Sequence, residues 1–181
     1  MENEAPKRKP LSPEKAHAKA ESYCAYQERS QQEVRDKLYD WGLYSTQVEQ
    51  LISTLIQDNF LNEERFALAF AQGKLRIKGW GRIKIKQALK FKRVPDKLIQ
   101  KALKNLDYDE YEQKLIAVFQ KKDRLLTEKD AFKRRYKLQQ YLLGRGFESD
   151  LILETSKKLL HYIEAKILCF VFASANAHAT I

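Results

Sequence analysis

The sequence has few of the residues that make tight turns or covalent cross-links. Its 181 residues include six glycines and four prolines, too few for the many turns of an all-β protein. Two cysteines, Cys24 and Cys169, cannot form a disulfide framework or a four-ligand zinc site. We interpret Cys24, which lies among aromatic residues, as a small buried hydrophobic residue. The composition therefore favours a helical protein without cross-links.

Long hydrophobic runs are also absent. The most apolar run covers residues 167–173, far below the roughly 20 residues that a membrane-spanning helix needs. Residues 1–10 are polar and no apolar stretch follows them, so we do not expect a secretory signal. The sequence predicts a cytoplasmic protein with no membrane contact.

The chain lacks the residue patterns of catalytic and cofactor sites. His17, His161 and His178 have no partners at metal-ligand spacing, and no Ser-His-Asp or Cys-His arrangement is present. Gly79-Trp80-Gly81 is not a dinucleotide-binding fingerprint, because Lys84 occupies the place of the third glycine and no strand precedes it. A phosphate-binding loop is missing too. We expect no enzyme activity, no metal and no cofactor.

What the sequence has in excess is positive charge. It contains 34 lysines and arginines against 24 acidic residues, which gives a formal net charge of +10. The hydrophobic share of 44% is sufficient for a core, while the charged share of 32% is above average. A charge of this size favours a polyanionic partner.

Helix signals repeat along the chain. Ser12-Pro13-Glu14 is typical of a helix start, and Ser30 with Glu33 forms a capping box for a second helix. Gly42 is positioned to end that helix. The apolar residues recur at offsets of 51 and then 53 residues. The matched sets are Val34, Ile85 and Leu138; Leu38, Leu89 and Leu142; Leu43, Val94 and Phe147; Val48, Ile99 and Ile152; Leu55, Leu106 and Leu159.

These offsets predict an all-α fold of three tandem three-helix repeats, at residues 12–60, 61–107 and 108–162. Residues 1–11 would be a disordered basic arm, and residues 163–181 an apolar tail of uncertain structure. A single repeat is too small to bury its own apolar faces, so we expect the repeats to stack into an elongated, curved array. Gly42 is matched by Gly146, but Arg93 takes that place in the middle repeat. This departure suggests a different or less sharp helix end there.

The positive charge is concentrated in the middle repeat. Residues 74–104 contain twelve basic residues and one acid, Asp96, and one sign sustained over such a length is unusual for a purely solvated surface. On a helical wheel Arg82, Lys86, Lys90 and Arg93 fall within about 80° of one another, beside an apolar face. The candidate nucleic-acid or filament contacts are Lys74, Arg76, Lys78, Arg82, Lys84, Lys86, Lys90, Lys92 and Arg93.

Two further features are open to more than one interpretation. Trp80, between two glycines, could stack on a nucleobase, or it could pack in the core where the following helix begins. A second and weaker basic cluster contains Lys133, Arg134, Arg135 and Lys137. We keep both interpretations of Trp80 and assign the second cluster no role at this point.

The chain resembles the RecX family, the bacterial regulators of the RecA recombinase. The resemblance runs from about residue 16 to residue 160 and is most specific between residues 29 and 94. The matching segments are Arg29-Ser30-x-x-Glu33-Val34-x-x-Lys37-Leu38-x-x-Trp41-Gly42, then Phe60-Leu61-Asn62-Glu63-Glu64-Arg65-Phe66-Ala67, and Gly79-x-Gly81 followed by Ile85-x-x-x-Leu89. The family is also described as tandem three-helix repeats, in agreement with the internal alignment.

The resemblance implies a protein that lies in the groove of a RecA filament on single-stranded DNA, and we expect this protein to be a monomer. There it would inhibit ATP turnover, strand exchange and coprotease activity, in DNA repair and the SOS response. One alternative is a helix-turn-helix-like protein that binds DNA directly. Another is a helical adaptor that binds a protein through the apolar tail, which has no match in the family.

Overall fold

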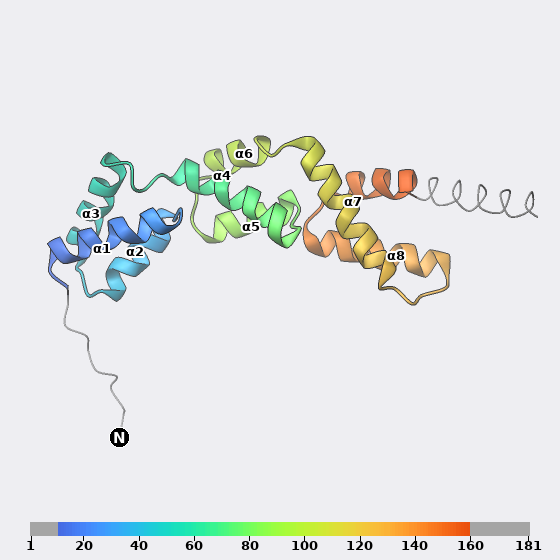
Figure 1. Cartoon of the computed structure of the whole chain (residues 1–181), viewed down its shortest axis with the longest axis horizontal. Coiled ribbons are helices and arrows are strands. Elements are labelled where there is room, and N and C mark those ends of the chain that lie inside the picture. The colour runs from blue at the N-terminus through green and yellow to red at the C-terminus, as the bar shows by residue number, and fades with distance from the viewer. Residues whose placement is uncertain (1–10, 160–181) are drawn as a thin grey trace, which may run out of the picture. The chain divides into compact units, whose positions relative to one another are not determined.

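A computed structural model describes residues 11–159, and this part of the chain is entirely helical (Figure 1). No strand occurs in it, and none of its helices is long and apolar enough to cross a membrane. Residues 149–159 are also helical. The preceding elements are α1 (Pro13–Tyr26), α2 (Gln31–Asp40), α3 (Ser45–Gln57), α4 (Glu63–Gly73), the π-helical turn η1 (Lys74–Lys78), α5 (Arg82–Phe91), α6 (Asp96–Lys104), α7 (Tyr108–Arg124) and α8 (Ala131–Arg145).

The burial pattern confirms the tandem-repeat fold. Leu38, Leu89 and Leu142, which the sequence places at equivalent positions, are all 0% exposed. The other matched sets are buried too, apart from Leu159, which is partly exposed. Cys24 is buried as expected, at one end of a row of small residues on α1. The same register repeats in the first helix of each repeat, where the buried sets are Ala16, Ala20 and Cys24; Ala67, Ala71 and Leu75; Tyr111, Leu115 and Phe119.

The three repeats end their middle helix in the same way. In each, a residue one or two positions after the helix has a positive φ, with values of 85° for Gly42, 60° for Arg93 and 85° for Gly146. The N–H of the next residue then donates to the carbonyl of the residue five positions earlier. In the middle repeat, the N–H of Val94 donates to the carbonyl of Leu89 at 3.2 Å. This is the Schellman geometry. The expectation of a different end in the middle repeat was therefore wrong, because Arg93 adopts the glycine conformation.

Arg93→Gly is expected to raise the free energy of unfolding by about 0.5–1 kcal/mol, because a left-handed conformation strains every residue with a Cβ. Urea denaturation of the two proteins would measure the change. The control is Gln100→Gly in the exposed interior of α6, where the same residue should lower stability by about 1 kcal/mol. A loss of stability in Arg93→Gly would contradict the assignment of strain.

The helix starts follow the sequence only in part. Ser30 and Glu33 form the predicted capping box, with the N–H of Glu33 donating to the Ser30 hydroxyl at 3.2 Å. Ser12 stands before α1 as expected, but its side chain makes no capping hydrogen bond.

The described residues divide into two compact units. Unit 1 consists of residues 11–78 and 85–107, and unit 2 of residues 79–84 and 108–159. The first three residues of α5 thus pack with the third repeat, while the rest of α5 packs with the first two. The repeat boundaries and the curved array stay predictions. The predicted arm at residues 1–11, except Leu11, and the predicted tail at residues 163–181 lie outside the described residues.

Candidate nucleic-acid interface

Helix α5 presents two cations of the predicted set to solvent. Its core side is formed by Ile85 and Leu89, both 0% exposed, and Lys86 and Lys90 are exposed. Within the described part of the chain, Lys86 makes no hydrogen bond or ion pair. Lys90 Nζ lies 3.1 Å from Asp96 Oδ1, and both side chains are more than half exposed. Such an exposed pair contributes little stability, so an incoming phosphate can replace it.

Two further cations lie just beyond the end of α5. Lys92 Nζ is 2.7 Å from Glu33 Oε1, in a pair that is about three-quarters buried. Burial alone would raise the pKa of Glu33, but hydrogen bonds from Lys92 and Ser30 lower it below its usual value. Arg93 is exposed and donates from Nη1 to Gln32 Oε1 at 3.3 Å. Lys92 therefore connects the second repeat to the first, whereas the side chain of Arg93 stays exposed.

Arg82 and Lys84 belong to unit 2 and make several intramolecular contacts. The Arg82 guanidinium lies 4.1 Å from the ring centroid of Tyr111, and its Nη1 is 3.6 Å from Glu148 Oε1. Lys84 Nζ donates to the carbonyl oxygen of Gly144 at 3.2 Å and lies 5.1 Å from the centroid of the half-buried Trp80. These contacts stabilise unit 2 and restrain both cations.

Lys74, Arg76 and Lys78 lie on the π-helical turn η1, which continues α4. Arg76 and Lys78 are exposed and Lys74 is half-buried. π-helical turns are rare and occur frequently at functional sites. Of the nine predicted residues, unit 1 thus holds seven, and only Arg82 and Lys84 lie in unit 2.

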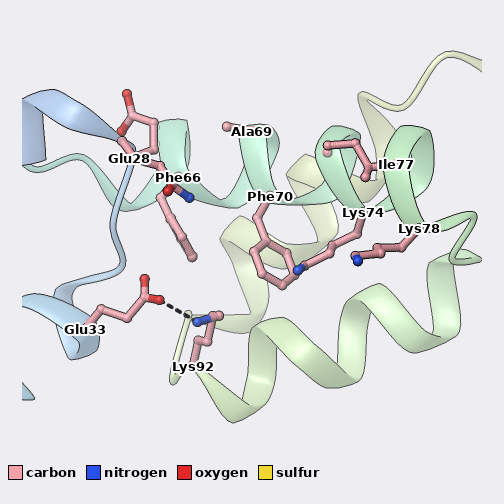
Figure 2. Close-up of a pocket in the computed structure, with 11 residues that line it drawn as sticks. Glu28, Glu33, Phe66, Ala69, Phe70, Lys74, Ile77, Lys78 and Lys92 are labelled. Carbon is pink, nitrogen blue, oxygen red and sulfur yellow. Dashed lines mark hydrogen bonds and ion pairs between the residues drawn. The ribbon is translucent and has the colours of Figure 1, made fainter.

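A groove of about 420 Å³ in unit 1 brings three of these cations together with aromatic rings. We name it the aromatic–basic groove, and Figure 2 shows the end of Lys74 beside the ring of Phe70. The Lys74 Nζ lies 4.9 Å from that ring centroid, and Lys92 Nζ lies 5.7 Å from it. The aromatic and charged residues that line the groove are Phe66, Phe70, Lys74, Lys78, Lys92, Glu28 and Glu33.

The sequence prediction missed the aromatic floor of this groove. Phe66, Phe70, Lys74 and Lys78 follow one another at intervals of four residues, which keeps them on one face of a helix. Two aromatic rings followed by two cations at that interval are the signal that could have identified the groove. The prediction from sequence assigned no site role to either ring.

One group of possible metal ligands was also missed. His17, Glu21 and Asp58 each place a ligand atom within 4.8 Å of the others. His17 and Glu21 are one turn apart on α1, but Asp58 lies beyond α3 and could not be paired with them from spacing. His17 Nδ1 is 3.8 Å from Glu21 Oε1, which is the geometry of an ordinary ion pair when the histidine is protonated.

Known protein families match this chain repeat by repeat. The RecX models of the first, second and third three-helix domains match residues 16–55, 62–103 and 109–155. The regulatory protein RecX of Prosthecochloris aestuarii is 34% identical over 146 residues, which are 81% of this chain and 94% of that protein. The regulatory protein RecX of Clostridium perfringens strain 13 is 32% identical over 124 residues, which are 67% of this chain and 58% of that longer protein.

Solved structures show the same fold. The crystal structure of RecX from Lactobacillus salivarius superposes with a TM-score of 0.73 at 24% identity, covering 81% of this chain and 96% of that one. A second structure, of a regulatory protein RecX, gives a TM-score of 0.73 at 21% identity and covers 80% of this chain and 71% of that one. With all three domains matched in order and a relative above 30% identity, the chain belongs to the RecX family.

Proposed function

We propose that this protein regulates the RecA recombinase in the cytoplasm by binding the RecA filament on single-stranded DNA. In this proposal it acts mainly as an inhibitor, reducing the ATPase, strand exchange and coprotease activities of the filament. Membership of the RecX family supports the role in regulation. The basic surface of unit 1 supports contact with the DNA in the filament.

The observation that carries the DNA contact is the exposure of Lys86, Lys90 and Arg93. Lys86 has no partner among the described residues, and the contacts of Lys90 and Arg93 are exposed ones. These three cations can meet phosphates without breaking a buried pair. If all three do, log affinity for a single strand should fall with log salt at a slope of about −2 from these residues alone. The remaining six predicted residues would contribute less to the affinity for DNA, or would stabilise the fold around this surface.

Lys86→Glu with Lys90→Glu is expected to raise the protein concentration that half-inhibits the DNA-dependent ATPase of RecA by about tenfold or more. Arg82 is left unchanged, because its contacts with Tyr111 and Glu148 make it part of the fold of unit 2. Titration of RecA ATPase with the wild type and the variant would measure the shift.

The matched control is Lys97→Glu with Lys104→Glu. These two residues of α6 are exposed, and neither makes a hydrogen bond or ion pair within the described part of the chain. The net charge change is the same, so only loss of a specific contact separates the two variants. Equal inhibition by both variants would contradict the proposed interface. Tight binding to one duplex sequence, with no effect on RecA, would instead favour the helix-turn-helix alternative.

A further inference from the structure

The outer side of α8 exposes apolar side chains where a surface helix normally carries polar ones. Phe132 is 81% exposed, Tyr136 is 57% exposed and Leu143 is 41% exposed. At 100° per residue these three positions fall within about 40° of one another, and they lie on the side away from the buried Leu138 and Leu142. We name this stripe the outer face of α8. Two exposed aromatic rings one turn apart indicate a binding surface.

Two cations flank the aromatic rings. On the helical wheel Lys133 lies about 60° to one side of Tyr136, and Arg135 lies about 60° from Phe132 on the other side. Both are exposed, and neither side chain makes a hydrogen bond or ion pair within residues 11–159. The acid nearest in sequence, Asp130, caps α8 by accepting from the backbone N–H of Lys133 at 2.8 Å. The rings therefore lie between two cations that the described chain does not neutralise.

The other cations of the same cluster have a different role. Arg134 Nε lies 2.7 Å from Asp123 Oδ1, and the guanidinium also donates to the backbone carbonyls of Asp123 and Leu126. Lys137 Nζ lies 2.8 Å from Glu128 Oε2. The nearby acids are thus paired with the cations that face α7 and its loop. This sorting leaves the outer face of α8 both aromatic and positively charged.

We propose that the outer face of α8 is a second nucleic-acid site, at which unstacked bases of a single strand stack on Phe132 and Tyr136. Aromatic rings bind bases of any sequence through their π-faces, while flanking cations bind the phosphates. The two rings are separated by about 6 Å along the helix, nearly twice the 3.4 Å spacing of stacked bases. This spacing suits an extended single strand and not a duplex, whose bases are paired and covered.

The ligand class rests on the proposed function, but the test does not need RecA. Phe132→Ala with Tyr136→Ala is expected to weaken binding of the full chain to a fluorescein-labelled oligothymidylate by at least about 30-fold. Because no charge is removed, the salt dependence should keep its slope. Lys133→Gln with Arg135→Gln should instead make that slope less steep by about 1.4. Fluorescence anisotropy at several salt concentrations would measure both.

The control variant removes two exposed rings from unit 1. Tyr26 is 86% exposed and Tyr44 is 74% exposed, and Tyr26→Ala with Tyr44→Ala should leave oligothymidylate affinity within about twofold of the wild type. An abasic oligomer of equal length tests stacking directly. It should bind the wild type as weakly as oligothymidylate binds the Phe132→Ala, Tyr136→Ala variant. Circular dichroism of each variant would verify the fold.

Equal affinity of wild type and Phe132→Ala, Tyr136→Ala for oligothymidylate would overturn the inference. That result would mean that another occupant covers the stripe, such as a protein partner or residues 163–172 of the chain. Equal affinity of the wild type for the abasic oligomer and oligothymidylate would also overturn it. Failure of the RecA proposal gives a different result. The wild type would then not inhibit the RecA ATPase, while these oligonucleotide measurements would be unchanged.

Discussion

Gly81→Ala is expected to destabilise unit 2 by about 3 kcal/mol, close to the upper end of what one added methyl group causes. A Cβ at this position would lie 2.2 Å from the carbonyl oxygen of Gly146 and 2.4 Å from the backbone nitrogen of Phe147. Both neighbours are backbone atoms, so no side-chain rotation can relieve the overlap. Either α5 or the end of α8 has to move.

That movement would break hydrogen bonds that the start of α5 needs. The N–H of Gly81 donates to the carbonyl of Arg145 at 2.9 Å, and the N–H of Ile83 donates to the carbonyl of Gly146 at 3.0 Å. The first N–H groups of a helix have no partner within the helix. Leaving a buried donor such as that of Gly81 unsatisfied costs about 1–3 kcal/mol. The expected effect therefore includes lost hydrogen bonds as well as overpacking.

Urea denaturation would measure this loss, and Gly144→Ala provides the control. A Cβ on Gly144 would meet nothing within 4 Å, and this exposed residue lies within α8. Alanine there should raise the free energy of unfolding by about 0.5–1 kcal/mol, because it is the better helix former. A change of less than 1 kcal/mol in Gly81→Ala would show that the close approach of the two backbones is not needed.

The role of Gly81 also explains what the sequence could and could not predict near Trp80. The position of Trp80 between two glycines suggested stacking on a base as one of two interpretations. In the structure both glycines are buried, and a Cβ on Gly79 would come within 2.8 Å of Val118. Their function is close packing against α7 and α8, which no local pattern can reveal. The half-buried Trp80 fits the interpretation in which it packs where the helix begins.

The tandem helices were predictable because a matched apolar residue has the same physical task in each repeat. Leu38 predicts Leu89 and Leu142, since all three must be buried for the helices to pack. The helix end at Arg93 was not predictable in this way. Local preference favours glycine for a positive φ, but burial of Val94 and its hydrogen bond to Leu89 impose the same turn on arginine.

The candidate site was predictable as a concentration of charge but not as a set of available cations. Helical spacing was enough to place Lys86 and Lys90 away from the core. No pattern along the chain indicates that Lys92 pairs with Glu33, 59 residues earlier. The pairing of Arg82 with Glu148 is equally hidden from the sequence, because it depends on how repeats pack. Separating paired from available cations required the fold.

Tyr111→Phe is expected to lower the free energy of unfolding by about 2 kcal/mol, although it removes a single oxygen atom. Tyr111 is 0% exposed. Its hydroxyl accepts from the N–H of Arg82 at 2.9 Å and donates to Glu148 Oε2 at 2.6 Å. Without it, a helix-start N–H and a partly buried carboxylate both lose a partner. The ring remains, so its stacking with the Arg82 guanidinium is kept and the change isolates the hydroxyl.

The pH dependence of this difference tests whether the folded state keeps the Tyr111 hydroxyl protonated. Burial, and next the Glu148 carboxylate that accepts its hydrogen bond, raise the pKa of Tyr111 well above that of a free tyrosine. A folded-state pKa that is raised contributes stability which is fully present below the unfolded value, about 10, and is lost as the pH rises above it. The gap between wild type and Tyr111→Phe should therefore be constant at neutral pH and shrink above pH of about 10. Urea denaturation across that range would measure it.

Tyr108→Phe, which changes a 53% exposed residue, should stay within about 0.5 kcal/mol of wild type throughout. A gap that does not narrow in alkali would mean that the folded state does not hold the Tyr111 hydroxyl in its protonated form.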